Sequence, residues 1–264
     1  MSLSQLTLVV VAAMIAGAMN SIAGGGTLLT FPALVALGVS PLQANATSTV
    51  ALVPGSVGSV WGYRAVLRGT GRWALSFALP SVLGGALGAW LLLVTPPERF
   101  SDLVPWLVLG ATALFMIQRP ALRWISRHSL KAQSPEPRAE ETLTAERPPL
   151  SLLAYQFSVA IYGGYFGAGV GILMLAALGF MGLTNIHRMN GLKNWCGVCM
   201  NLVAAGMFAF SSLVNWRVAL AMAGGAVAGG YLGSRLAQRV SQDLVRRAVV
   251  VIGLVSGLLL FLGP

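Results

Sequence analysis

Charged side chains are scarce in this sequence, and acidic ones are the scarcest. Only 9% of its 264 residues are charged, whereas 56% are hydrophobic and the mean hydropathy is +0.77. The apolar residues gather in runs long enough to cross a bilayer, so the composition predicts a polytopic membrane protein. The 17 basic residues, against 7 acidic ones, lie in short clusters between those runs. Positive-inside bias explains this placement, and we predict no nucleic-acid binding.

No Asp or Glu lies inside any apolar run. This absence argues against a carboxylate proton relay and against an anionic sodium site within the membrane. The sequence begins without a basic segment ahead of a short hydrophobic one, and we expect no cleaved signal peptide. We also expect no cofactor and no bound metal.

Cysteine is nearly absent, with Cys196 and Cys199 as the two examples. Their spacing matches the redox Cys-x-x-Cys motif, but they lie in a long apolar run and not beside a βαβ pattern. We interpret them as buried packing thiols, since free cysteine behaves as a small hydrophobe. A redox or sulfur-relay role is the alternative.

Glycine is abundant, and its placement predicts a broken helix. Three consecutive glycines, Gly24 to Gly26, interrupt the apolar run 6–37, and glycine leaves helical geometry most readily. Inside a bilayer the freed backbone groups are tolerated only where they are buried in protein or line a wet cavity. A weaker copy of the pattern follows at 167–171. Two broken helices in corresponding positions indicate the binding site of a secondary transporter.

The chain divides into two halves with the same order of elements. A first transmembrane repeat covers 1–117 and a second covers 150–264, and a polar, cytoplasmic linker at 118–149 joins them. Several residue pairs share an offset of 145: Gly24 with Gly169, Gly26 with Gly171, Asn45 with Asn190, and Gly88 with Gly233. We therefore predict a duplicated fold.

Loop charge predicts that the two halves are inverted. The loop 64–72 is basic and the loop 98–102 slightly acidic, whereas in the second half the positive bias has moved to 235–247. Each half must then cross the membrane an odd number of times. The stretch 28–37 covers only about 15 Å, half a bilayer. We predict an all-α integral membrane protein of two inverted repeats, each with three full spans plus a glycine-broken re-entrant helical hairpin.

The candidate site residues lie in and after the two breaks. Helix N-termini there offer unpaired N–H groups and about half a positive charge to an anion. Lys193 is the ionisable candidate at membrane depth, with snorkelling to the interface as its alternative. For Asn45, Thr47 and Ser48 the alternative is N-capping. We predict substrate binding by Asn20, Gly24, Gly25, Gly26, Thr27, Asn45, Thr47, Ser48, Gly169, Gly171, Asn190, Lys193 and Asn194.

At these residues the sequence resembles the TauE/SafE sulfite exporter family of membrane permeases, of the 4-toluene sulfonate uptake permease type. The resemblance rests on Ala23-Gly24-Gly25-Gly26-Thr27-Leu28-Leu29-Thr30-Phe31-Pro32 and on 38–48, 187–194, 214–216 and 229–236. It implies a multi-pass permease of the bacterial inner membrane for a small sulfur-containing or organic anion, such as sulfite, sulfoacetate or a related sulfonate. The second copy departs from the triplet, because Val170 stands within it.

These observations together predict a secondary membrane transporter, not an enzyme, for such an anion. Its midplane site would lie between the two broken-helix hairpins, and its partners would be the anionic substrate and the lipid bilayer. A homo-oligomer is compatible with the sequence. The alternatives are an anion channel and a membrane-embedded thiol or sulfur-relay protein that uses Cys196 and Cys199.

Overall fold

The computed structural model describes residues 2–22, 24–68, 70–128, 147–181, 183, 185–236 and 242–262, and these form ten helices and no strand. The prediction of an all-α fold is confirmed. The first half holds α1 (Leu3–Ile22), α2 (Thr27–Ala36), α3 (Pro41–Tyr63), α4 (Gly71–Val94) and α5 (Pro97–His128). The second holds α7 (Leu150–Tyr165), α8 (Val170–Phe180), α9 (Ile186–Ala209), α10 (Trp216–Leu236) and α11 (Gln242–Leu262).

The first glycine break separates α1 from α2, as predicted. Gly24 and Gly25 have φ values of 77° and 108°, in the left-handed region that side chains with a Cβ disfavour. Gly26 returns to helical geometry and is the N-cap of α2. The chain therefore turns back within three residues, and α2 has only 10 residues, about 15 Å of helix.

The second break repeats this turn between α7 and α8, although its sequence is weaker. Gly167 and Gly169 have φ values of 77° and 75°, and Gly169 is the N-cap of α8. Val170 follows as the first residue of that helix. The valine therefore does not prevent the break, because only the positions on either side of Ala168 need the left-handed region.

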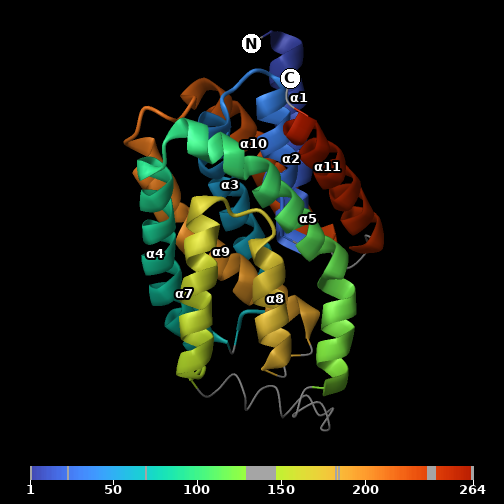
Figure 1. Cartoon of the computed structure of the whole chain (residues 1–264). Coiled ribbons are helices and arrows are strands. Elements are labelled where there is room, and N and C mark those ends of the chain that lie inside the picture. Colours follow the sequence, from blue (N-terminus) through green and yellow to red (C-terminus); the bar gives the residue numbers. More distant parts are fainter. Residues whose placement is uncertain are drawn as a thin grey trace.

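The main contacts that a helix of one half makes with the other half are also made, in return, by its counterpart. Helix α1 packs on α10 as α7 packs on α4, and α3 packs on α10 as α9 packs on α4. In the same way α2 contacts α11 and α8 contacts α5, while α3 meets α9 and α5 meets α11. Figure 1 shows α1 beginning and α11 ending at one end of the bundle, whereas α7 begins at the opposite end.

Small residues let these helices approach closely. Gly225 and Gly229 of α10 lie against the backbone of α1 at Val10 and Met14, and Gly230 lies against the carbonyl of Gly55 in α3. On the other side Gly88 of α4 lies against the Ile161 carbonyl of α7. Such contacts are typical of helices packed within a membrane. They join α1, α3 and α10 into one unit and α4, α7 and α9 into another.

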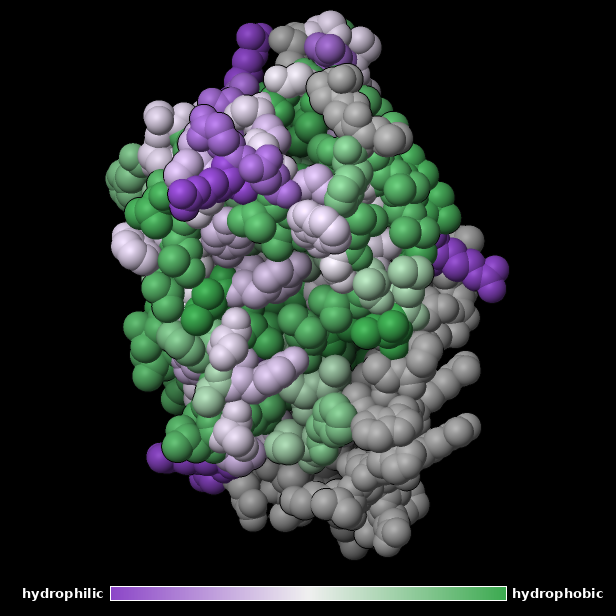
Figure 2. All heavy atoms as spheres, viewed as in Figure 1, coloured by the Kyte–Doolittle hydropathy of each residue, from purple (hydrophilic) through white to green (hydrophobic). Residues whose placement is uncertain are grey.

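The outer surface is apolar over the middle of the bundle. Figure 2 shows hydrophobic residues across the centre of the visible face, with hydrophilic ones mostly in its upper left part, at its lower left and at one place on its right edge. Among the described residues, Leu3–Ile22, Gly71–Val94 and Pro97–Ile117 are long and apolar enough to cross a membrane. On α4 the exposed side chains include Leu75, Leu79, Leu83 and Trp90, which is where lipid would lie. The fold is that of a multi-pass membrane protein.

Candidate functional site

A cavity lies where the two glycine breaks meet the middle of α3 and α9. Its volume is about 50 Å³, and part of it is open to the surroundings. Its lining combines backbone at the breaks with amide, hydroxyl and apolar side chains. The lining residues are Asn20, Gly24, Gly25, Thr27, Thr49, Leu52, Ser56, Phe166, Gly167, Val170, Gly171, Met174, Lys193, Asn194, Gly197 and Asn201.

Both halves contribute equivalent positions to this cavity. From α3 come Thr49, Leu52 and Ser56, and from α9 come Asn194, Gly197 and Asn201. Each pair in this order is separated by 145 residues, the offset that relates the two breaks. The cavity therefore lies at the junction of the two halves. Equivalent faces of α3 and α9 line it.

The Asn20 side chain shapes the first break. Its Oδ1 accepts hydrogen bonds from the backbone N–H groups of Gly25 at 3.0 Å and Gly26 at 2.7 Å. These donors precede α2 and would otherwise be free. Asn20 thus holds the turn in place from the last helical turn of α1.

Lys193 of α9 is buried, with only 3% of its surface exposed. Its Nζ donates to the backbone carbonyl of Asn20 at 3.0 Å and reaches that of Ser21 at 3.5 Å. Asn194 Nδ2 also donates to the Ser21 carbonyl, at 3.1 Å. The ammonium thus stabilises the C-terminal, partly negative end of α1. A snorkelling lysine would have an exposed ammonium, so that alternative does not fit.

The second half is held in the corresponding way. Asn45 Nδ2 of α3 donates to the carbonyl of Tyr165 at the end of α7, at 2.9 Å. Tyr165 corresponds to Asn20 under the offset of 145 residues. Each half therefore caps the broken helix of the other half. The capping side chain comes from α3 in one case and from α9 in the other.

The structure brings seven of the predicted residues to the cavity: Asn20, Gly24, Gly25, Thr27, Gly171, Lys193 and Asn194. The other six do not line it. Gly26 and Gly169 are the N-caps of α2 and α8. Thr47 Oγ1 accepts from the backbone N–H of Asn215 at 3.0 Å, and Ser48 shares a hydrogen bond with Thr30. Asn45 and Asn190 are buried, and Asn45 contacts α7.

The N-capping alternative for Asn45, Thr47 and Ser48 is wrong. Helix α3 begins at Pro41 after the N-cap Ser40, so all three lie inside the helix. In the second half Asn185 is the N-cap of α9, and its side chain accepts from the N–H groups of His187 and Arg188. Pro41 indicates the earlier start of α3, because proline is common at the first position of a helix.

Sequence reasoning missed three polar residues of the lining: Thr49, Ser56 and Asn201. Thr49 and Ser56 are seven residues apart, as are Asn194 and Asn201, so each pair lies on one face of its helix. The shared offset of 145 relates the two pairs. Polar pairs at this spacing in both halves were the available signal.

The chemistry of the cavity is that of neutral donors around one ammonium. Among the described side chains the carboxylates are Glu98 and Asp102, both exposed and neither in the lining. The described part of the chain contains no cluster of His, Cys, Asp and Glu able to hold a metal ion. Cys196 is fully buried in an apolar cluster, and Cys199 is half-buried. The arrangement can accept a small anion, since a buried ammonium favours a negative partner.

The fold and the cavity define a polytopic helical protein with a site between two broken helices, which is the architecture of membrane transporters. Residues 9–260 match the sequence model of the family Sulfite exporter TauE/SafE, and the chain belongs to this family. The family resemblance seen in the sequence is therefore confirmed.

Curated relatives support the same class. A probable membrane transporter protein, ORF9, of Sinorhizobium sp. is 28% identical over 98% of this chain and 93% of its own length. The probable membrane transporter protein YfcA of Escherichia coli is 29% identical over 92% of this chain and 84% of its own. YunE of Bacillus subtilis, described in the same words, is 24% identical over 94% of this chain and 96% of its own. No solved structure matches the chain.

Proposed function

We propose that this protein is a secondary transporter that carries a small sulfur-containing or organic anion, such as sulfite, sulfoacetate or a related sulfonate, across the bacterial inner membrane. The observation that carries the proposal is the Lys193 ammonium beside the cavity. It is buried, it has two backbone carbonyls as partners, and no described carboxylate lies in the lining. An anion in the cavity supplies the opposite charge that a buried cation needs.

The proposal includes two inverted repeats, each with three full spans and a re-entrant hairpin. It is supported by the opposite ends at which α1 and α7 begin (Figure 1) and by the exchanged helix contacts. The short α2 and α8, of 10 and 11 residues, each cover about half a bilayer. Such a duplication allows one site to face the two sides of a membrane in turn.

Neutral donors suit an oxyanion that is bound and released in every cycle. Hydroxyl and amide groups from Thr49, Ser56, Asn194 and Asn201 lie on the two facing helices, and each provides a hydrogen bond without a full charge. One ammonium with several neutral donors binds an anion without holding it as strongly as a cluster of cations would. Membership of the family Sulfite exporter TauE/SafE supports sulfite or a related sulfonate as the transported anion.

An uptake panel in proteoliposomes tests this function. Purified protein is reconstituted, and uptake of labelled sulfite, sulfate, thiosulfate, sulfoacetate, taurine and lactate is measured against empty liposomes. We expect saturable uptake of at least one sulfur-containing anion, accelerated by unlabelled anion inside the vesicles, which a carrier shows and a channel does not. Uptake of none of these anions by folded protein would contradict the proposal.

A further inference from the structure

Four buried side-chain oxygens of the described residues have no hydrogen-bond partner: Ser21 Oγ, Asn45 Oδ1, Tyr63 Oη and Asn190 Oδ1. Three of them, from Ser21, Tyr63 and Asn190, lie toward one end of the bundle, in residues that are 0%, 3% and 1% exposed. Such groups are rare, because each has lost its hydrogen bonds to water without replacing them. Ser21, Tyr63 and Asn190 are called the polar cluster below. Packing alone does not explain polar side chains at these positions, so we look for a function that needs them.

The polar cluster joins three helix ends. Ser21 lies in the last turn of α1, Tyr63 is the last residue of α3, and Asn190 lies in the second turn of α9. The Tyr63 hydroxyl is within reach of the Ser21 hydroxyl, although no hydrogen bond joins them. A Cβ on Gly191 would lie 3.7 Å from Tyr63 Cβ, so the beginning of α9 packs against the end of α3.

The polar cluster lies between the cavity and one end of the bundle. Asn190 lies one turn before Asn194, on the same helix face, and Asn194 both lines the cavity and donates to the Ser21 carbonyl. Asn190 is four residues from the beginning of α9 at Ile186, which is about 6 Å along the axis. Lys193 stands where the cavity meets the cluster.

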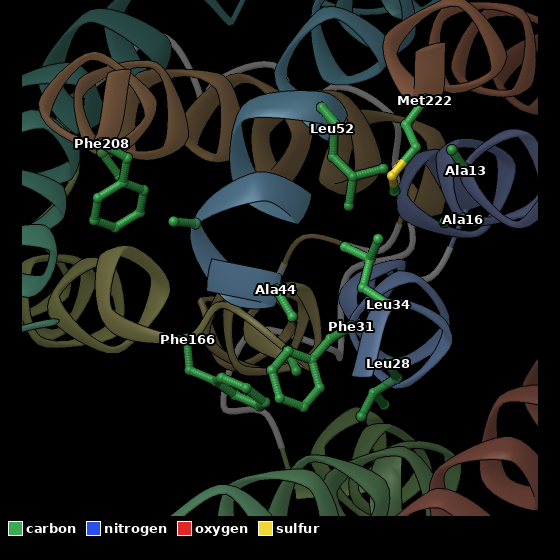
Figure 3. Packing of buried hydrophobic residues seen from close by; sticks show 14 of the residues in the cluster. Ala13, Ala16, Leu28, Phe31, Leu34, Ala44, Leu52, Phe166, Phe208 and Met222 are labelled. Atoms are coloured by element: carbon green, nitrogen blue, oxygen red, sulfur yellow. The ribbon is translucent and has the colours of Figure 1, made fainter. Parts of the chain in front are cut away.

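The equivalent positions at the opposite end are apolar. Under the offset of 145 residues Ser21 corresponds to Phe166 and Tyr63 to Phe208, and both phenylalanines are buried in the same core. Phe166 packs edge-to-face on Phe31 with ring centroids 5.4 Å apart (Figure 3). Asn190 keeps its type as Asn45, whose Nδ2 donates to the Tyr165 carbonyl and whose Oδ1, like that of Asn190, has no partner. The two ends of the cavity therefore differ in chemistry.

On the basis of the proposed transport function, we propose that the polar cluster lines the route by which the anion passes between the cavity and the end of the bundle where α3 ends and α9 begins. The route is closed in this structure, and its hydroxyl and amide groups gain partners when it opens to water and the anion. An anion leaving the Lys193 ammonium needs hydrogen-bond donors along its path, and Ser21, Tyr63 and Asn190 supply them. At the opposite end the apolar Phe166 and Phe208 stand where Ser21 and Tyr63 would be, and they offer an anion no hydrogen-bond donor.

Matched tyrosine substitutions separate this role from a structural one. Tyr63→Phe removes an unpartnered hydroxyl, so thermal stability should stay equal or rise. The maximal transport rate should nevertheless fall by about 3- to 10-fold, the effect of one lost hydrogen bond, with a nearly unchanged KM. Tyr155→Phe is the control. The Tyr155 Oη donates to the Leu173 carbonyl over 3.1 Å, and Tyr155 does not line the cavity. This substitution should lower stability and leave the rate unchanged. A wild-type maximal rate in both Tyr63→Phe and Ser21→Ala would overturn the inference.

Thiol accessibility tests the route independently of transport, so it also distinguishes failure of this inference from failure of the proposed function. Cys196 and Cys199 are replaced by alanine, and Tyr63→Cys or Phe208→Cys is introduced at the two equivalent positions, neither of which lines the cavity. The probe is 2-sulfonatoethyl methanethiosulfonate, a small impermeant sulfonate, added on the side of the loop that follows Tyr63 for Tyr63→Cys and on the opposite side for Phe208→Cys. We expect Tyr63→Cys to react at least about 10-fold faster than Phe208→Cys, because only the polar route admits the reagent. Equal rates, or a faster Phe208→Cys, would contradict the route.

Discussion

Lys193 donates to two backbone carbonyls at the end of α1, and in the proposed function it also binds the transported anion. Lys193→Met keeps the apolar stem but removes a charge-assisted hydrogen bond, which contributes about 1.5 to 3 kcal/mol. We expect the apparent affinity for the anion to fall by roughly 10- to 150-fold. Lys193→Arg should recover part of this loss, because a planar guanidinium keeps the charge but not the shape. Transport kinetics over a range of anion concentrations measure both.

Arg188→Met is the matched control for charge, since it removes a cation one turn and a half earlier on α9, outside the cavity lining. It should leave the KM within about twofold of wild type, because a partly exposed charge contributes little. A wild-type KM and rate for Lys193→Met would remove Lys193 from the substrate site. The cap of α1 would then be its whole role.

Gly25 tests the first break at a single residue. It combines a φ of 108° with a position where a Cβ would collide with the ring of Phe115. Gly25→Leu should therefore abolish transport and lower the melting temperature. Gly38→Leu is the control, because Gly38 has a φ of 84° and open space around it. It should cost about 1 to 3 kcal/mol of backbone strain and keep transport. Equal transport by the two variants would argue against a precise fit at the break.

At the scale of elements, the two crossed caps tie each broken helix to the other half. Asn45→Ala removes the hydrogen bond to the Tyr165 carbonyl, worth about 1 kcal/mol. We expect amide hydrogen exchange in 166–170 to accelerate by about 3- to 10-fold. Ser158→Ala, which removes a bond within α7, should not change it. If exchange at the second break were the same in Asn45→Ala and wild type, the cap would not hold α7.

The helix breaks were predictable from sequence because a glycine at positive φ is a local requirement, independent of what surrounds it. The helical class and the order of elements followed from apolar runs for the same reason. The lining of the cavity was only partly predictable. It depends on how α3 and α9 are rotated, and tertiary contacts such as the backbone packing of Gly55 against α10 set that rotation. The capping role of Lys193 was likewise invisible, since its partners lie more than 170 residues away in sequence.

At the scale of the whole molecule, the inverted arrangement predicts that equivalent loops face opposite sides of the membrane. Arg68→Cys and Ser212→Cys, each in a protein without Cys196 and Cys199, place a thiol at exposed positions of the equivalent loops. Impermeant thiol reagents should label Arg68→Cys from the cytoplasmic side and Ser212→Cys from the periplasmic side. Labelling of both from one side would contradict inverted repeats. The Gln133 region, for which we predict cytoplasmic exposure, lies outside the described residues.

A structure of the protein with the transported anion bound tests the central claim most directly. The account predicts density for the anion in the cavity between the two breaks, within hydrogen-bond distance of Lys193 Nζ and of at least one of Thr49, Ser56, Asn194 and Asn201. It also predicts that the same anion is absent from a Lys193→Met crystal grown at the same concentration. Density at another place in the bundle, with an empty cavity and an unchanged Lys193, would contradict it.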